Sequence, residues 1–344
     1  MPAVPPGSLV LLTGASGFIA THTVQAFLDA GYPVRGTVRS KDKGEYLANL
    51  FKGSKVPFEY IIVEDIGKSG AFDEAVKDVV GVAHTASPFH FKATNPEELI
   101  RPAVDGTVGV LKSIQKHNPN VKRVVITSSV AAIRSGAPSP AVYTEKDWNE
   151  QSTENVKKLG SAANPSDKYQ ASKTLAEKAF WKFIEDEKPS FDGATIHPPL
   201  TMGPVIQPLG SIEQINTSNG IVLSWFRDNH KQDEIPPSAP FNWVDARDVA
   251  QAHVRALAVP EAGGERFITS AGPAGPNDYV LAFERFFPDR TTYPKGNKAE
   301  VATWHAKSDL FDGSKAERVL GIKYHQLDES VKDTIDSLVK RYNV

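Results

Sequence analysis

The first part of the chain alternates between short apolar runs and longer segments whose apolar residues recur at helical spacing. Short runs with few polar residues are typical of strands that are buried on both faces of a parallel sheet. These runs cover residues 8–13, 33–38, 58–63, 81–87 and 121–127. The helical spacing predicts helices at residues 19–28, 71–80 and 96–117. Strict alternation of the two predicts the α/β class, as a doubly wound parallel sheet with right-handed crossovers and helices on both faces.

Beyond residue 130 the pattern is less regular. Residues 131–167 carry no clear apolar period, and we expect a long loop that forms a functional wall, with a solvated loop as the alternative. A sixth strand at 191–197 ends at Pro198-Pro199, because proline cannot continue a central strand. Later segments predict helices near 221–226 and 327–342, a helix that residues 243–250 lead into and that runs through 257, and a strand at 266–269.

The change in amino-acid composition after Pro199 predicts that the chain forms a larger domain and a smaller lobe. Glycine and proline become frequent there, as in Gly203-Pro204 and Pro236-Pro237, and mark an irregular region. We expect a larger domain of residues 1–199 with about 241–260. Residues 200–240 and 261–344 are expected to form a smaller substrate-binding lobe that closes over the carboxyl edge of the sheet.

Composition narrows the range of functions. The 344 residues carry a net charge of −2, so the chain lacks the basic footprint of a protein that binds nucleic acid or an anionic membrane. It has no cysteine for disulfides or thiolate chemistry, and its nine histidines show no close metal-ligand spacing. Neither a signal peptide nor a run of ~20 apolar residues is evident. We expect a cytoplasmic protein without a metal, nucleic-acid or membrane partner.

A glycine turn follows the first predicted strand directly and opens the first predicted helix. Its residues are Thr13, Gly14, Ala15, Ser16, Gly17, Phe18, Ile19 and Ala20. Gly14 permits a tight turn, Gly17 lets the backbone approach a pyrophosphate, and the small Ala20 lets the helix pack close to the strand. Amides at the helix N-terminus then hold the phosphates. An ordinary strand-to-helix turn is the alternative, but this setting favours a dinucleotide site in a Rossmann domain.

The end of the second strand indicates which dinucleotide binds. An acidic residue at this point binds the ribose 2′-hydroxyl of NAD, whereas an arginine accommodates the 2′-phosphate of NADP. Here the strand ends in Arg39-Ser40-Lys41, and the first acid is Asp42. A guanidinium can hold a phosphate through paired hydrogen bonds. The sequence therefore favours NADP(H), with a solvated basic loop as the alternative.

Polar residues follow three further strands at their carboxyl ends. They are Asp65 after the third strand, Thr85-Ala86-Ser87 after the fourth and Ser128-Ser129 after the fifth. Ligands of doubly wound sheets bind outside the carboxyl ends of the strands. We therefore expect these residues to share one site with the glycine turn and Arg39.

Tyr169-Gln170-Ala171-Ser172-Lys173 heads another helical segment. Tyr169 and Lys173 are four residues apart and share one helix face. An ammonium beside a phenol favours the ionised phenol, so the pair could move a proton at neutral pH where a lone tyrosine could not. The spacing alone also fits a surface tyrosine with a solvated lysine.

Taken in order, these motifs resemble those of the extended short-chain dehydrogenases/reductases over nearly the whole chain. The resemblance rests on residues 13–20, 127–129 and 169–173. Residues 34–39, 102–107 and 197–200 resemble the dihydroflavonol-reductase-like branch, in particular the yeast-type NADPH-dependent aldehyde reductases and ketoreductases. The resemblance implies hydride transfer to an aldehyde or ketone. It assigns Tyr169 as the acid/base, Lys173 as the residue that holds the nicotinamide ribose and tunes Tyr169, and Ser129 as the group that polarises the carbonyl.

The resemblance also implies a set of cofactor contacts. They are Thr13, Gly14, Ser16, Gly17, Phe18, Ile19, Arg39, Asp65, Ile66, Thr85, Ala86, Ser87, Thr127, Ser128, Tyr169, Lys173, Pro199 and Leu200. Asp65-Ile66 would flank the adenine and Pro199-Leu200 would contact the nicotinamide amide. Ala103 stands where many extended members carry an asparagine that is assigned to proton relay or substrate binding. Its absence leaves the proton path behind Lys173 unassigned.

Two other functions stay open. A sugar-nucleotide epimerase or dehydratase would need further acid/base groups, yet Val130-Ala131-Ala132 follows Ser129. A non-catalytic NADP-sensing protein would need the glycine turn but not Tyr169 and Lys173.

The small-molecule carbonyl substrate is expected among the variable loops, at residues 88–95, 130–166 and 200–245. Candidate apolar contacts are Phe89, Phe91, Trp225, Phe226 and Trp243, with core packing as the alternative for the last three. A monomer or a homodimer is expected.

Overall fold

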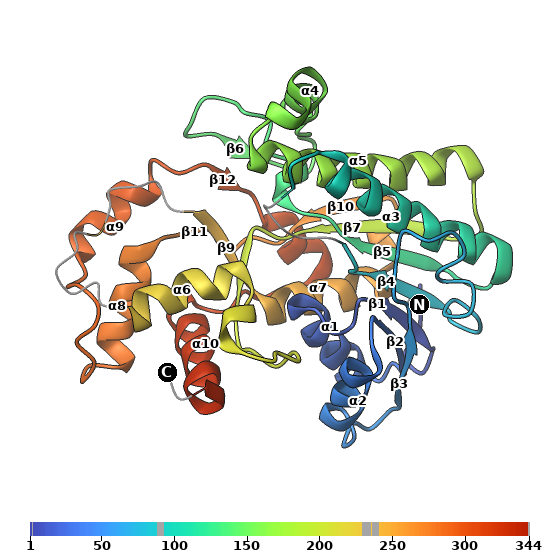
Figure 1. Ribbon diagram of the computed structural model, residues 1–344, viewed down its shortest axis with the longest axis horizontal. Helices are drawn as coiled ribbons and strands as arrows, with labels where there is room; N and C mark the ends of the chain where they lie inside the picture. Colours follow the sequence, from blue (N-terminus) through green and yellow to red (C-terminus); the bar gives the residue numbers. More distant parts are fainter. Residues whose placement is uncertain (2, 88–92, 229–234, 236–240, 343–344) are drawn as a thin grey trace.

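Seven parallel strands form the central sheet of the molecule, seen here in a computed structural model that describes residues 1, 3–87, 93–228, 235 and 241–342 (Figure 1). Across the sheet the order is β3 (Phe58–Ile62), β2 (Val34–Val38), β1 (Val10–Thr13), β4 (Gly81–His84), β5 (Arg123–Thr127), β7 (Asp192–His197) and β10 (Glu265–Ile268). All neighbouring pairs are parallel. The order runs outward from β1 in both directions, so the predicted doubly wound α/β class is confirmed.

Helices cover both faces of this sheet (Figure 1). One face carries α1 (Phe18–Asp29), α2 (Lys41–Leu50) and α7 (Ala246–Ala258), and the other carries α3 (Glu97–His117) and α5 (Pro165–Glu187). Each face has its own apolar cluster. In β1, Val10 and Leu12 pack into the first cluster while Leu11 packs into the second. Burial on both faces is why the strand sequence is continuously apolar rather than alternating.

A smaller lobe packs beside the carboxyl edge of the sheet. It contains a three-stranded sheet and an apolar cluster of its own. Its elements are β8 (Leu200–Met202), β9 (Phe241–Asp245), β11 (Pro273–Ala274), α6 (Thr217–Arg227), α8 (Pro276–Phe286), α9 (Lys298–His305) and α10 (Leu327–Tyr342). A separate two-stranded sheet pairs β6 (Val142–Tyr143) with β12 (Leu310–Phe311). Short 3₁₀ or π turns occupy Val130–Ala132, Gly160–Ala162, Ile212–Gln214, Pro260–Ala262 and Ala316–Leu320.

The helix predicted at 71–80 is wrong. This segment forms consecutive turns between β3 and β4, and Asp78 lies in the left-handed region at φ 64°. Side chains from other elements satisfy its carbonyl groups. Asn118 Nδ2 donates to the carbonyl oxygens of Val76 and Val79 at 2.7 and 2.8 Å. Buried apolar side chains at helical spacing are thus accommodated without a helix, and strand and helix do not alternate strictly.

The region 131–167 is not the continuous loop that its sequence predicts. It contains β6 and a further helix, α4 (Glu150–Leu159). Asn149 caps this helix by accepting a hydrogen bond from the amide of Ser152 at 3.0 Å. Ser152 is the one residue of the helix that is buried. A helix that buries so little has no apolar stripe to reveal it.

The sheet topology also differs from the expected division into two parts. Strand β10 lies in the range that was expected to belong to the small lobe, but it pairs with β7 and extends the central sheet. Strand β9 lies in the range that was expected to belong to the larger domain, but it pairs with β8 and β11 of the small lobe.

Within the described residues, no helix is long and apolar enough to cross a membrane.

Candidate active site

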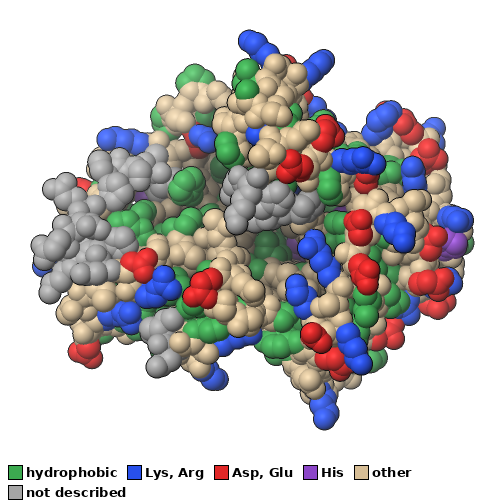
Figure 2. Space-filling model, viewed as in Figure 1, with side chains coloured by type: hydrophobic (Ala, Val, Ile, Leu, Met, Phe, Trp, Pro, Cys, Tyr) green, Lys and Arg blue, Asp and Glu red, His purple; other side chains and the backbone are tan. Residues whose placement is uncertain are grey.

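A cavity of about 820 Å³ lies at the carboxyl edge of the central sheet. Its wall on the sheet side consists of the residues that follow β1, β2, β3, β4, β5 and β7. Figure 2 shows the hollow near the centre of the molecule, with Lys and Arg side chains along its right-hand side. Helix α5 and the small lobe supply the remaining walls. The strand ends therefore converge on one cavity as expected, although Asp65 after β3 is not part of its wall.

The glycine turn is held by hydrogen bonds from neighbouring strands. Gly14 has φ +68°, and a Cβ atom there would lie 3.1 Å from the Cα and Cβ atoms of Ala86. Its amide donates to Thr37 Oγ1 at 2.9 Å. Thr13 Oγ1 accepts hydrogen bonds from the amides of Thr85 and Ala86, both at 3.1 Å. Glycine is thus required at position 14 by conformation and by space, and Thr13 fixes the end of β4 beside the turn.

Basic residues stand at the end of β2. Arg39 lines the cavity and is exposed. Lys43, in the first turn of α2, lines it too and is also exposed. The described residues that line this end of the cavity include no carboxylate. The arrangement suits an anionic group.

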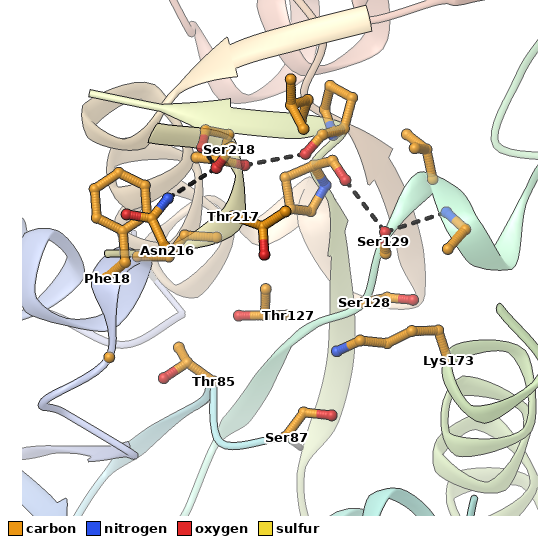
Figure 3. A pocket seen from close by; sticks show the side chains of 18 of the residues that line it. Phe18, Thr85, Ser87, Thr127, Ser128, Ser129, Lys173, Asn216, Thr217 and Ser218 are labelled. Atoms are coloured by element: carbon orange, nitrogen blue, oxygen red, sulfur yellow. Dashed lines mark hydrogen bonds between the residues drawn. The ribbon is translucent and has the colours of Figure 1, made fainter. Parts of the chain in front are cut away.

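Ser129 follows β5 at the opposite end of the cavity. Its Oγ accepts a hydrogen bond from the amide of Ala131 at 3.1 Å and lies 3.4 Å from the carbonyl oxygen of Pro198 (Figure 3). The hydroxyl of Tyr169 forms a hydrogen bond with Ser129. Two hydroxyl groups from different elements therefore meet on one wall of the cavity.

Helix α5 begins at Pro165, after Asn164, whose side chain accepts from the amide of Asp167 at 2.7 Å. This start places Tyr169 and Lys173 on the second and third turns, both in the cavity wall. Figure 3 shows the Lys173 side chain extending from its helix toward the strand ends near Ser128.

The protein environment changes the proton affinity of both groups. Burial raises the pKa of Tyr169 to about 12, and the hydrogen bond with Ser129 acts in the opposite direction. Burial lowers the pKa of Lys173 to about 8, and the charge of Glu177 offsets part of that effect. The sequence predicts a phenol whose ionisation is favoured by Lys173, but burial opposes ionisation here, and Ser129 rather than Lys173 is the group that lowers the pKa of Tyr169. Tyr169 therefore carries its proton at neutral pH.

Most residues predicted for the cofactor site line this cavity. They are Gly14, Ser16, Gly17, Phe18, Ile19, Arg39, Ile66, Thr85, Ala86, Ser87, Thr127, Ser128, Tyr169, Lys173, Pro199 and Leu200. Thr13 is fully buried behind the turn, and Asp65 instead accepts from the amide of Gly67 at 2.9 Å. Neither of these two side chains is part of the cavity wall.

Three of the five predicted apolar substrate contacts, Trp225, Phe226 and Trp243, are not part of the cavity wall. Phe226 and Trp243 are 1% and 3% exposed in the core of the small lobe, and Trp225 packs against that core. Phe89 and Phe91 lie outside the described residues. The alternative of core packing therefore accounts for Trp225, Phe226 and Trp243.

The sequence motifs do not single out several residues that line the cavity, although some of them lie in the loops at 130–166 and 200–245 that are expected near the substrate. They are Thr37, Lys43, Arg134, Asn216, Thr217, Ser218, Phe241, Asn242, Lys307, Asp309 and Phe311. Lys43 had a usable signal, because it lies four residues after Arg39 at the start of a helix. Lys307, Asp309 and Phe311 reach the site because β12 pairs with β6, and no local sequence pattern predicts this pairing.

Comparison with known proteins agrees with this geometry. Residues 10–272 match the family described as "NAD dependent epimerase/dehydratase family". A ketoreductase, azaE, of Aspergillus niger is 40% identical over 96% of this chain and 98% of its own length. The NADPH-dependent methylglyoxal reductase GRE2 of Saccharomyces cerevisiae is 34% identical over 96% of this chain and 98% of its own.

A solved structure has the same fold. Gre2 of Candida albicans in complex with NADPH superposes with a TM-score of 0.88 and 36% identity, covering 98% of this chain and 100% of that one. The resemblance predicted from the motifs is thereby confirmed. The chain belongs to the NAD dependent epimerase/dehydratase family, that is, to the extended short-chain dehydrogenases/reductases.

Proposed function

We propose that this protein is an NADPH-dependent carbonyl reductase that converts an aldehyde or a ketone to the alcohol. The observation that carries the proposal is the pair of hydroxyl groups on the cavity wall, Ser129 and Tyr169, which hydrogen bond to each other one helical turn from Lys173. The names of the relatives, a ketoreductase and a methylglyoxal reductase, support carbonyl reduction as the reaction class.

The cavity fits a dinucleotide. Its volume of about 820 Å³ lies within the range of roughly 300–1,000 Å³ that small-molecule sites occupy. The absence of a Cβ atom at Gly14 lets the turn pack against Ala86. The first amides of α1, from Phe18 onward, have no acceptor within the helix and would be the donors to the phosphates. Arg39 and Lys43 suit the 2′-phosphate, and Pro199-Leu200 with Thr85-Ala86-Ser87 would hold the remainder. When bound, NADPH supplies the hydride.

The residues at the other end of the cavity supply the proton and stabilise charge. Tyr169 is protonated at neutral pH and therefore serves as the proton donor to the carbonyl oxygen. Ser129 donates a hydrogen bond to the same oxygen while negative charge develops on it. Lys173 then stabilises the tyrosinate that remains. The proton donor, the hydrogen-bond donor and the cation thus have separate roles.

The test is NADPH oxidation with a panel of aldehydes, aryl ketones and α-keto esters, with NADH in parallel. Wild-type protein is expected to turn over NADPH with little activity toward NADH. Tyr169→Phe is expected to lower kcat by roughly 10²–10⁴-fold while NADPH binding persists. Tyr60→Phe is the matched control, because Tyr60 lies on β3 and bonds to Glu45 away from the cavity.

Three results would contradict the proposal. Full turnover by Tyr169→Phe would remove the assigned donor. NADPH binding without turnover of any carbonyl would favour the NADP-sensing alternative. Release of a changed sugar nucleotide without net oxidation of the cofactor would favour the epimerase alternative.

A further inference from the structure

Glu177 is a carboxylate buried in the centre of the molecule, behind the proposed catalytic residues. It is 1% exposed and lies on α5, one helical turn after Lys173. Both of its oxygens are engaged. Oε2 accepts from Ser128 Oγ at 2.6 Å and lies 2.8 Å from His197 Nε2. Oε1 accepts from Arg266 Nε at 2.7 Å and lies 3.3 Å from Thr195 Oγ1 and from Trp181 Nε1.

These partners come from three strands of the central sheet. Ser128 follows β5 and is the neighbour of Ser129 in the chain. His197 ends β7 and precedes Pro198, whose carbonyl oxygen lies beside Ser129. Arg266 is on β10. The Glu177 carboxylate therefore connects the helix of Tyr169 and Lys173 to the ends of β5 and β7, which lie beside Ser129.

Arg266 extends the same network to residues 145–148, between β6 and α4. Its Nη1 donates to the carbonyl oxygens of Glu145 and Asp147, the latter at 2.8 Å. Its guanidinium also lies 3.8 Å from the ring centroid of Trp148. The cation thus joins Glu177 to residues 145–148.

Charge is the second part of the arrangement. Lys173 is 9% exposed, so its ammonium requires a nearby negative charge. His84 faces it from β4, and burial together with the charge of Lys173 lowers the pKa of His84 to about 3, which keeps that imidazole neutral. Tyr169, on the same helix, carries its proton.

Glu177 is the group that supplies the negative charge. Burial opposes its ionisation, but His197 and Arg266 outweigh burial and hold the pKa of this carboxyl well below its usual range. The carboxylate is therefore ionised at every pH at which the enzyme would work, and its charge acts on Lys173.

We propose that Glu177 is a positioning residue for carbonyl reduction. It aligns Ser129 with Tyr169 through the strand ends, and it keeps Lys173 cationic. The kinetic part of this inference rests on the proposed function, whereas the charge part concerns the protein alone.

Two variants separate position from charge. Glu177→Gln keeps the size of the side chain but removes its charge. Glu177→Asp keeps the charge but withdraws it by one methylene from Ser128, His197 and Arg266. Asp167→Asn is the control, because Asp167 is also a buried carboxylate on α5, bonded to Ser152, Asn155 and Asn164 away from Lys173.

The first readout needs neither cofactor nor turnover. Competitive acetylation of the cofactor-free protein across pH, with the Lys173 peptide followed by mass spectrometry, reports the pH at which this amine loses its proton. Glu177→Gln is expected to move that midpoint down by about one pH unit. Glu177→Asp and Asp167→Asn are expected to leave it near the wild-type value.

The second readout is the pH profile of kcat with NADPH and a carbonyl that the wild type reduces. Both Glu177 variants are expected to lose roughly 10²-fold in kcat, because displacement of the reacting groups by about 1 Å costs that much. The alkaline limb should move to lower pH in Glu177→Gln alone. Circular dichroism and NADPH binding check that each variant is folded.

The outcomes decide each part. A wild-type acetylation midpoint in Glu177→Gln overturns the proposal even if kcat falls, because the residue would then be merely structural. A wild-type kcat in Glu177→Asp overturns the positioning role, and this arm stands if Glu177→Gln does not fold. If the wild type reduces no carbonyl, the proposed function fails, and the acetylation midpoints still decide the charge role of Glu177.

Discussion

Replacing Lys173 by methionine is expected to stabilise the cofactor-free protein while it abolishes turnover. Lys173 is 9% exposed, and burial lowers its pKa from an ordinary value of 10.5 to about 8. Since the unfolded chain binds this proton more tightly than the folded protein does, the ammonium costs stability. The difference between the two pKa values corresponds to about 3 kcal/mol. A methionine of similar length avoids this cost and adds apolar contact.

The dependence on pH distinguishes this effect from better packing alone. The cost is present in full below pH 8, and it declines as the pH rises from about 8 to about 10.5, where the unfolded chain also loses the proton. Lys173→Met should therefore exceed the wild type in free energy of unfolding by about 3 kcal/mol near pH 7. Near pH 9.5 the difference should be roughly half as large.

Urea unfolding of both proteins without NADPH, at the two pH values, measures this difference. Lys182→Met is the matched control, because Lys182 lies on the same helix with a side chain that is 74% exposed. It should change stability little at either pH. A Lys173→Met variant that is no more stable than the wild type near pH 7 would refute the reasoning, as would a difference that does not shrink with pH.

Two further predictions concern the cavity. Arg39→Ala and Lys43→Ala should each raise KM for NADPH roughly tenfold, because each removes a hydrogen-bonding cation beside the proposed 2′-phosphate site. KM for NADH should change little. Equal effects on both cofactors would contradict this assignment. Phe226→Ala should lower the free energy of unfolding by about 3–5 kcal/mol, because Phe226 is 1% exposed. Phe241 lines the cavity and is 67% exposed, so Phe241→Ala should change the substrate KM but not Tm. Thermal unfolding and steady-state kinetics of the two variants check the second prediction, and a change in KM for Phe226→Ala alone would contradict it.

Much of the fold could be predicted because its determinants are local. The inner strand β1, for example, is short and packed on both faces, so its sequence is almost wholly apolar. The predictions of secondary structure are wrong where the local sequence pattern and the tertiary structure disagree. Residues 71–80 have helical spacing, but side chains such as Asn118 satisfy their backbone. Helix α4 is nearly all polar, so only the signals at its ends, such as the capping residue Asn149 and the glycine at Gly160, could have indicated it.

The candidate site divides in the same way. The glycine turn, Arg39, Ser129 and the Tyr169–Lys173 helix are contiguous motifs at predicted strand ends, and the structure gathers them on one cavity. The partners that surround them are brought together by pairings between distant segments. Arg266 could be assigned to a strand from its sequence, but nothing local indicates that this strand joins β7 and reaches Glu177. Ordinary side chains of this kind become visible only in three dimensions.

Lys173 and Glu177 lie one helical turn apart, yet they are expected to affect stability in opposite directions. When Lys173 is replaced by methionine, Glu177 keeps Arg266 and His197 as partners, so no charge is left alone. When Glu177 is replaced by glutamine, Lys173 and Arg266 remain as buried cations without their carboxylate, which is strongly destabilising. The buried ammonium of Lys173 therefore destabilises the fold at the proposed catalytic centre, and the charge of Glu177 reduces that destabilisation. Stability alone would favour another residue at position 173 and the carboxylate at position 177, so the presence of Lys173 supports a charge that serves the proposed reaction rather than the fold.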